Sequence, residues 1–189
     1  MNIYELKNRD DAIIDKLYIV WESSVRATHL FLKEDDIINI SKHVKQAFIV
    51  VKDLIVVEID NEVKGFIGID DKKIEMLFLD PTIIGKGIGK KLIEYAITNY
   101  AIEEVSVNEQ NTNAYNFYKH IGFKSYKRDE FDDLGNNFPI IHMKLYIKIY
   151  KNNFYIKYIL KIFKFVNFFI VLFPAAKRTK KCKYKISTK

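Results

Sequence analysis

The stretch Ile84-Gly85-Lys86-Gly87-Ile88-Gly89 decides how the rest of the chain is interpreted. It follows an apolar run over residues 74–79 and the pair Asp80-Pro81, and it precedes a helical pattern over residues 90–96. The order is therefore strand, glycine loop, helix. The N–H groups at the start of a helix are unpaired and carry the positive end of the helix dipole, and glycines let a phosphate approach the backbone. Because many such loops are plain turns, the loop alone suggests a phosphate site without establishing one.

The spacing of the glycines sets aside two common phosphate-binding motifs. A P-loop needs four residues between its first glycine and a Gly-Lys pair, followed by Ser or Thr, whereas Lys90 is followed by Lys91. The dinucleotide-binding fingerprint needs Gly-x-Gly-x-x-Gly in an early βαβ unit, whereas these glycines alternate and lie in the middle of the chain.

A second motif follows at residues 111–123, with the sequence NTNAYNFYKHIGF. The first loop resembles the acetyl-CoA pyrophosphate loop of the GCN5-related N-acetyltransferases (GNAT family), in which Gly-x-Gly-x-Gly follows a strand ending in Asp-Pro. The second motif resembles that family's Asn-x-x-Ala-x-x-Phe-Tyr-x-x-x-Gly-Phe. Two motifs in the right order and at the right distance are far more specific than either alone. The resemblance implies the acyl-CoA N-acyltransferase fold, acetyl-CoA as co-substrate, and direct attack by an acceptor amine.

The pattern of apolar and polar residues gives a fold without the resemblance. It predicts an α/β chain with a mixed, mostly antiparallel sheet and helices on both faces. The acetyltransferase fold has the same element order. The expected strands cover residues 3–6, 54–60, 64–70, 73–79, 104–108, 124–131 and 139–146, and the expected helices cover about 10–28, 33–51, 87–100 and 113–121. A tight turn is expected at Asn61-Glu62, between the second and third of these strands.

Charge and cysteine content divide the chain in two. Of its 31 Lys and Arg residues, 12 lie in residues 148–189, where there is no Asp or Glu, so the other 19 face all 24 acidic residues. The net charge of +7 is thus a property of the tail and gives no reason to expect nucleic-acid binding by the body. A single cysteine, Cys182, and an N-terminus without a signal-peptide pattern predict a cytoplasmic protein.

The resemblance ends near Tyr146, so we expect a GNAT domain over residues 1–147 and a separate tail over residues 148–189. The tail is rich in Phe, Ile and Lys. Two interpretations stay open: a basic amphipathic helix that lies on an anionic membrane surface, or an unselected extension. A membrane-spanning helix is less favoured, because several lysines fall within the apolar segment.

The resemblance also assigns residues to the coenzyme. The strand at 77–79 offers its backbone to the pantetheine arm, the glycine loop holds the pyrophosphate through N–H groups, and Asn111 hydrogen-bonds the coenzyme. The expected coenzyme-binding residues are Leu77, Phe78, Leu79, Gly85, Lys86, Gly87, Ile88, Gly89, Lys90 and Asn111. One departure is Ile84, where the family usually has Arg or Gln; the loss of that side chain predicts weaker binding of acetyl-CoA.

Acetyl transfer needs a neutral amine, a polarised carbonyl and a proton for the leaving thiolate. The resemblance places Tyr118 beside the coenzyme sulfur, where a phenol can act as general acid. Several alternatives stay open for the general base. Glu75 is the best candidate by its position in the family, but a surface carboxylate is the simpler interpretation, and some family members use a chain of water molecules.

Residues 21–32 and 130–139 resemble a bacterial subfamily, the YjaB-type acetyltransferases. This resemblance implies that Trp21, His29 and Phe31 line the acceptor pocket, although His29 could equally be a helix-end hydrogen-bonding residue. His142 lies inside an expected strand and is interpreted as a hydrogen-bonded core histidine. No cluster of His and Cys suggests a metal site. The acceptor is a small-molecule amine or a protein lysine, and the chain is expected to be a monomer or a homodimer.

A rival function from another class stays open. A coenzyme-A-binding protein with little transfer activity would have the same fold, and Ile84 is the residue that favours it.

Overall fold

The computed structural model describes residues 1–146, so the predicted tail helix and the predicted division after residue 147 lie outside the described residues. The strands are β1 (Asn2–Glu5), β2 (Asp53–Ile59), β3 (Glu62–Asp70), β4 (Lys73–Leu79), β5 (Glu104–Asn108), β6 (Phe123–Asp129) and β7 (Ile140–Leu145). The helices are α1 (Asp11–Thr28), α2 (Glu34–Val50), α3 (Ile88–Tyr100) and α4 (Thr112–Ile121), with the 3₁₀ turn η1 (Pro81–Ile83) before α3.

The strands form one mixed sheet in the order β1-β2-β3-β4-β5-β7-β6. Neighbouring strands are antiparallel, apart from β4 and β5, which are parallel. The last of the described strands, β7, lies between β5 and β6, so the β6–β7 hairpin folds back into the sheet instead of extending its edge. The predicted fold class is therefore confirmed.

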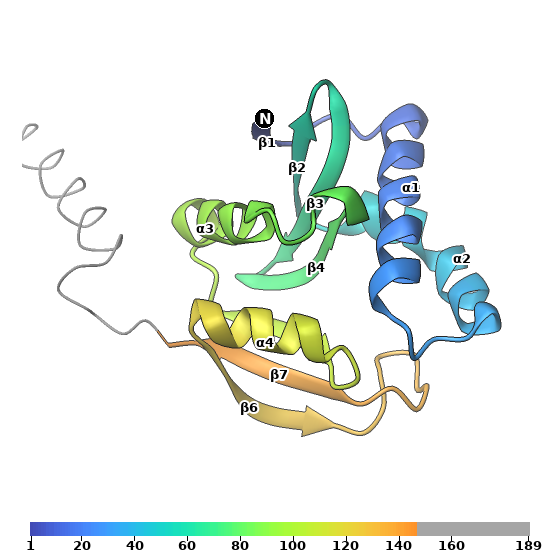
Figure 1. The fold of residues 1–189 in the computed structure, drawn as a ribbon, viewed down its shortest axis with the longest axis vertical. Helices are drawn as coiled ribbons and strands as arrows, with labels where there is room; N and C mark the ends of the chain where they lie inside the picture. The colour runs from blue at the N-terminus through green and yellow to red at the C-terminus, as the bar shows by residue number, and fades with distance from the viewer. Residues whose placement is uncertain (147–189) are drawn as a thin grey trace, which may run out of the picture. The chain divides into compact units, whose positions relative to one another are not determined.

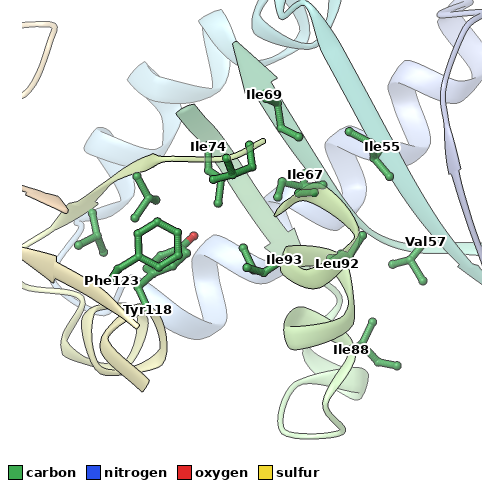
Figure 2. Packing of buried hydrophobic residues seen from close by; sticks show 14 of the residues in the cluster. Ile55, Val57, Ile67, Ile69, Ile74, Ile88, Leu92, Ile93, Tyr118 and Phe123 are labelled. Atoms are coloured by element: carbon green, nitrogen blue, oxygen red, sulfur yellow. The ribbon is translucent and has the colours of Figure 1, made fainter. Parts of the chain in front are cut away.

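Each face of the sheet is covered by a different pair of helices (Figure 1). Along β2, Leu54 and Val56 pack on the α1–α2 side, whereas the alternate residues Ile55 and Val57 pack on the α3–α4 side. Figure 2 shows the cluster on the α3–α4 side, in which residues of β2 and β3 meet α3 and α4. The helices are thus held by burial of the two apolar faces of the central strands.

The first hairpin turn lies one residue earlier than we predicted. Asp60 and Asn61 occupy the two central positions, with φ angles of 53° and 63°. Both angles are in the left-handed region that a tight two-residue hairpin turn requires and that Asp and Asn tolerate. As a result β3 begins at Glu62 and not at Lys64.

The end of α2 is closed by a side chain from the segment before α1. The guanidinium of Arg9 donates hydrogen bonds to the carbonyl oxygens of Phe48, Ile49, Val51 and Lys52, at 3.0, 3.0, 2.6 and 3.0 Å. The last carbonyls of a helix have no partners within the helix, and the negative end of its dipole favours a cation. Arg9 therefore supplies both the missing donors and the charge.

Candidate active site

The parallel strands β4 and β5 stay together for only two residue pairs, Lys73 with Glu104 and Ile74 with Val105. Beyond Ile74, no other described strand pairs with this edge of β4. The backbone N–H and C=O groups along this edge are therefore open to a ligand that carries amide groups, as the pantetheine arm of coenzyme A does. The predicted coenzyme strand, residues 77–79, forms the far end of this edge.

A β-bulge lies where the two strands separate. In the pairing of β3 with β4, Ile69 faces Ile74 but the next pair is Gly68 with Met76, so Glu75 has no partner. A bulge bends a strand and increases its twist. We infer that the bulge at Glu75 turns the second half of β4 away from β5 and so opens the gap between them.

The glycine loop has the geometry of a phosphate cradle. Gly85 and Gly87 have φ angles of 80° and 78°, and a Cβ at either position would meet nothing within 4 Å. No hydrogen bond to another described residue engages the backbone N–H groups of Gly85, Gly87, Ile88, Gly89 or Lys90. Unpaired N–H groups at the start of α3 and open space above them fit a diphosphate.

Charged side chains surround this loop, but its first residue is apolar. Lys86 and Lys91 are exposed, and Lys90 lies 3.9 Å from Glu94 one turn further along α3. Ile84 is 45% exposed and makes no polar contribution. The loop thus offers backbone N–H groups and lysine side chains to a phosphate, without a side-chain donor at its first position.

We expect Ile84→Arg to bind acetyl-CoA more tightly. An exposed guanidinium beside a diphosphate adds about 1 kcal/mol, which corresponds to a Kd that is roughly fivefold lower. Isothermal titration at low and high salt measures the effect, which salt should reduce. Ile84→Met is the matched control, since it changes the side chain without adding charge. Equal affinities for the Arg and Met variants would show that residue 84 does not face the phosphates.

Asn111 joins the predicted coenzyme side of the site to the predicted acceptor side. It is 8% exposed, and its side-chain Oδ1 accepts a hydrogen bond from the backbone N–H of Ala114, at 3.1 Å, which caps α4. This orientation leaves its Nδ2 directed to the ring of His29, 3.4 Å from Nε2. One side chain therefore caps α4 through its Oδ1 and contacts His29 through its Nδ2.

Tyr118, the predicted general acid, lies in α4 and is 6% exposed. Its ring packs edge-on against Phe117 and Phe123, with centroids at 5.3 and 5.7 Å. Its hydroxyl points toward the part of the cluster that holds Ile74 and Ile93 (Figure 2). The hydroxyl makes no hydrogen bond to another described residue. Burial raises the pKa of this phenol above its ordinary value, so it stays protonated at neutral pH.

Two of the predicted acceptor residues meet in a group of aromatic side chains, which we call the aromatic cluster: His29, Phe31, Phe78 and Phe138. The ring centroids are 5.6 Å apart for His29 and Phe31, 6.1 Å for His29 and Phe78, and 6.0 Å for Phe31 and Phe138. The cluster thus joins the α1–α2 loop, the predicted coenzyme strand β4 and the β6–β7 loop.

The hydrogen bonds of His29 show which of its two ring nitrogens carries the hydrogen. The hydroxyl of Thr28 donates to the carbonyl of Ser24 at 2.7 Å, so its oxygen accepts from Nδ1–H of His29 at 2.9 Å. The lone pair on Nε2 is then the acceptor for the amide of Asn111. Burial lowers the pKa of His29 to about 4, so the ring is neutral at physiological pH. His29 is both a residue of the aromatic cluster and a helix-end hydrogen-bonding residue.

The third predicted acceptor residue, Trp21, lies elsewhere in the packing. It is 3% exposed in the core between α1 and the sheet, and among the described residues its ring pairs with that of Tyr18, at 5.5 Å. The structure does not join it to the aromatic cluster. Its burial gives it a packing role in α1, and contact with the acceptor stays a prediction.

The predicted base, Glu75, lies at the bulge with 36% of its side chain exposed, and it pairs with Lys73 at 2.9 Å. It borders a hollow of about 390 Å³. The other residues around this hollow are Asp70, Asp71, Lys72, Lys73, Glu103 and Glu104. Glu75 is thus held in an ion pair by Lys73, and its role as general base stays a prediction.

Three residues of the site had no predicted role. Phe138 and Thr28 fall in the two stretches that resemble the YjaB-type enzymes, so those stretches were the available signal. Phe117 lies against the start of α3: a Cβ on Gly89 would come within 3.3 Å of its ring and of the Leu79 side chain, a tight contact that glycine avoids. Within residues 1–146, no group of three or more His, Cys, Asp or Glu side chains is arranged to hold a metal ion.

An open β4 edge, a glycine loop with free N–H groups and a buried phenol behind the gap together define an acyltransferase that uses acyl-coenzyme A. Residues 39–147 match the acetyltransferase (GNAT) domain. The chain belongs to the GNAT family of N-acetyltransferases, and it is an enzyme that uses acetyl-CoA and an amine acceptor.

Two curated relatives are similar over most of their length. The chain is 37% identical to the peptidyl-lysine N-acetyltransferase YjaB of Salmonella typhimurium, over 68% of this chain and 89% of the relative. It is 33% identical to YjaB of Escherichia coli, over 68% and 88%.

Solved structures have the same fold. Apo-form YjaB from Escherichia coli has a TM-score of 0.67, with 76% of this chain and 97% of that chain covered. An aminoglycoside 6'-N-acetyltransferase complexed with coenzyme A has a TM-score of 0.53 at 13% identity, covering 78% of this chain and 99% of that chain. None of the helices in residues 1–146 is long and apolar enough to cross a membrane.

Proposed function

We propose that this N-acetyltransferase modifies the ε-amine of lysine side chains in peptides or proteins, by direct attack of the neutral amine on the thioester of acetyl-CoA. The observation that carries this proposal is the 37% identity to a peptidyl-lysine N-acetyltransferase over 89% of that relative. A small-molecule amine is the second candidate for the acceptor.

The coenzyme would be held along the open edge of β4 and at the start of α3. The proposed contacts are the backbone of Leu77, Phe78 and Leu79, the N–H groups of Gly85, Gly87, Ile88, Gly89 and Lys90, the charge of Lys86, and Asn111. The unpaired N–H groups of the loop and the early end of the β4–β5 pairing support this assignment. Acetyl-CoA supplies the thioester; the chain supplies position, charge and proton transfer.

Tyr118 is the proposed general acid. Its phenol is protonated at neutral pH and its oxygen is free of other described partners, so it is able to donate a proton to a departing thiolate. His29 and Phe31 are the proposed acceptor-side contacts, since the aromatic cluster offers an apolar surface to the aliphatic part of a lysine. We propose a cytoplasmic, bacterial enzyme that acts as a monomer or homodimer, with its catalytic domain ending at residue 147.

A panel of acceptors tests the lysine proposal. The full chain is incubated with acetyl-CoA and a short peptide that has a blocked amino terminus and one lysine, and release of coenzyme A thiol is followed. The comparisons are the same peptide with arginine, a peptide with a free amino-terminal alanine, and an aminoglycoside. We expect kcat/KM for the lysine peptide to exceed the others by roughly tenfold or more. A higher kcat/KM for the aminoglycoside or for the free amino terminus would contradict the lysine proposal and identify that amine as the acceptor class.

A further inference from the structure

A chain of three polar side chains crosses the sheet beside the gap between β4 and β5. Ser106 of β5 and His142 of β7 are paired in the sheet, and the Ser106 Oγ lies 3.0 Å from Nδ1 of the His142 ring. The other ring nitrogen, Nε2, lies 2.7 Å from Oδ2 of Asp129 on β6. We call these residues the Ser106–His142–Asp129 chain.

The position of Ser106 relates this chain to the proposed chemistry. Val105 makes the last pair with β4, so Ser106 is the first residue of β5 beyond the point where the strands separate. Val105 and Val107 are buried in the same cluster as Tyr118, on the α3–α4 side. Since side chains alternate along a strand, Ser106 points to the opposite face of the sheet. The gap between the strands therefore has the phenol on one face and Ser106 on the other.

The hydrogen bonds assign the protons. A carboxylate accepts only, so Nε2 of His142 carries the hydrogen and donates it to Asp129. In the neutral ring, Nδ1 then has the lone pair and accepts the hydroxyl hydrogen of Ser106. The Ser106 oxygen keeps its own lone pairs for a further donor. This is the arrangement in which a serine hydroxyl passes a proton to an imidazole and a carboxylate stabilises the resulting cation.

We propose that the Ser106–His142–Asp129 chain accepts the proton of the attacking amine. The Ser106 oxygen takes the N–H proton as the new N–C bond forms, its own hydroxyl proton moves to Nδ1 of His142, and Asp129 stabilises the imidazolium. The proton later leaves to solvent, because 20% of the His142 side chain is exposed. This inference rests on the proposed amine attack and gives it the base that the family resemblance left undetermined.

The other basic side chains near the gap are less suited to this role. Nε2 of His29 already faces the amide of Asn111, and its ring lies in the aromatic cluster. Glu75 is paired with Lys73. Of these three groups, His142 is the one whose acceptor atom, Nδ1, is hydrogen-bonded to a hydroxyl where β4 and β5 separate, that of Ser106.

The groups that surround His142 decide how a pH profile is interpreted. Facing it are Ser106 on β5, and Tyr126, Lys127 and Asp129 on β6; the ring of Tyr126 is 6.2 Å away, and Lys127 pairs with Asp129 at 2.7 Å. On β7 itself, Lys144 lies over the ring of Tyr126 and pairs with Glu104. Hydrogen bonds from Lys127 and His142 lower the pKa of Asp129, and hydrogen bonds from Tyr126 and Lys144 lower the pKa of Glu104. The hydrogen bond to Glu104 raises the pKa of Tyr126. An acid limb that disappears when the histidine is replaced is therefore assigned to the imidazole.

The test compares variants of the full chain on whichever amine of the acceptor panel the wild type acetylates. His142→Asn keeps an acceptor for the Ser106 hydroxyl but takes no proton. We expect kcat to fall by roughly 10²-fold and the acid limb of its pH profile to disappear, with the KM for acetyl-CoA within about twofold of the wild type. The matched control is His43→Asn, on the exposed face of α2, which should leave both unchanged.

A second pair of variants guards against misfolding of the histidine variant. Ser106→Thr keeps a hydroxyl and suits a strand, so we expect this variant to retain most of the wild-type kcat. Ser106→Ala removes the hydroxyl, so we expect its kcat to fall as it does in His142→Asn. Wild-type kcat and an intact acid limb in both His142→Asn and Ser106→Ala would overturn the proton chain. A wild type that acetylates no amine of the panel would overturn the proposed function itself, and with it this inference.

Discussion

Replacing Tyr118 with phenylalanine is expected to lower kcat by roughly 10²-fold, while the affinity for acetyl-CoA changes by less than about twofold. The ring stays, so the edge-on packing against Phe117 and Phe123 is preserved. Only the proton for the leaving thiolate is lost. Steady-state kinetics and titration of acetyl-CoA measure the two quantities separately.

The same helix offers a matched control for this change. Tyr115 accepts a hydrogen bond from Ser125 at 3.2 Å and is not part of the proposed site, so Tyr115→Phe should leave kcat nearly unchanged. Because burial raises the pKa of Tyr118 above about 10, its deprotonation produces no alkaline limb below that pH. Turnover that survives in Tyr118→Phe would show that another group, or water, protonates the thiolate.

Replacing Arg9 with methionine is expected to cost about 2–3 kcal/mol of unfolding free energy. The side chain binds four carbonyls at the end of α2, and hydrogen bonds from a charged donor contribute more than neutral ones. The cost stays below the sum of four such bonds because water solvates the freed carbonyls. For a chain of this size the midpoint of thermal unfolding should fall by roughly 5–10 °C.

Urea unfolding of Arg9→Met and Arg9→Lys separates the two contributions of the guanidinium. Lysine keeps the charge near the helix dipole but not the planar array of donors, so we expect it to recover about half of the loss. A methionine variant within about 0.5 kcal/mol of the wild type would mean that α2 does not depend on this cap.

The order of elements could be predicted because it depends on local patterns. Apolar residues at helical spacing marked α1 and α3, and β-branched runs between Asp, Asn and Gly marked the central strands. The shift of the first turn from residues 61–62 to Asp60 and Asn61 is the size of error that such patterns give, since neighbouring polar residues suit either position.

The features that sequence reasoning missed join residues that are far apart in the chain. Arg9 binds carbonyls about 40 residues away, and Asn111 contacts His29 across 82 residues. The interpretation of His142 as a core histidine was right about its hydrogen bonds and wrong about its burial, because the sheet face formed by β5, β7 and β6 leaves it partly exposed. Its partners became visible only once β7 was seen to lie between β5 and β6.

The bulge at Glu75 was equally hidden. A bulge depends on which residues of two strands face one another. The pattern of residues along β4 does not change at Glu75, so the sequence of that strand does not mark the bulge. The motif therefore predicted a coenzyme strand, but it did not explain why that strand separates from β5.

Counting products tests most directly whether the chain is an acetyl-lysine-forming enzyme or only binds coenzyme A. The full chain, acetyl-CoA and the blocked lysine peptide are incubated together, and free coenzyme A and acetylated peptide are quantified by mass spectrometry against Tyr118→Phe. We predict one acetylated lysine for each coenzyme A released, at a rate that the variant lowers by roughly 10²-fold. Acetyl-CoA that raises the unfolding temperature of the chain, yet yields no acetylated peptide above the enzyme-free rate, would contradict lysine acetylation and favour the coenzyme-binding alternative.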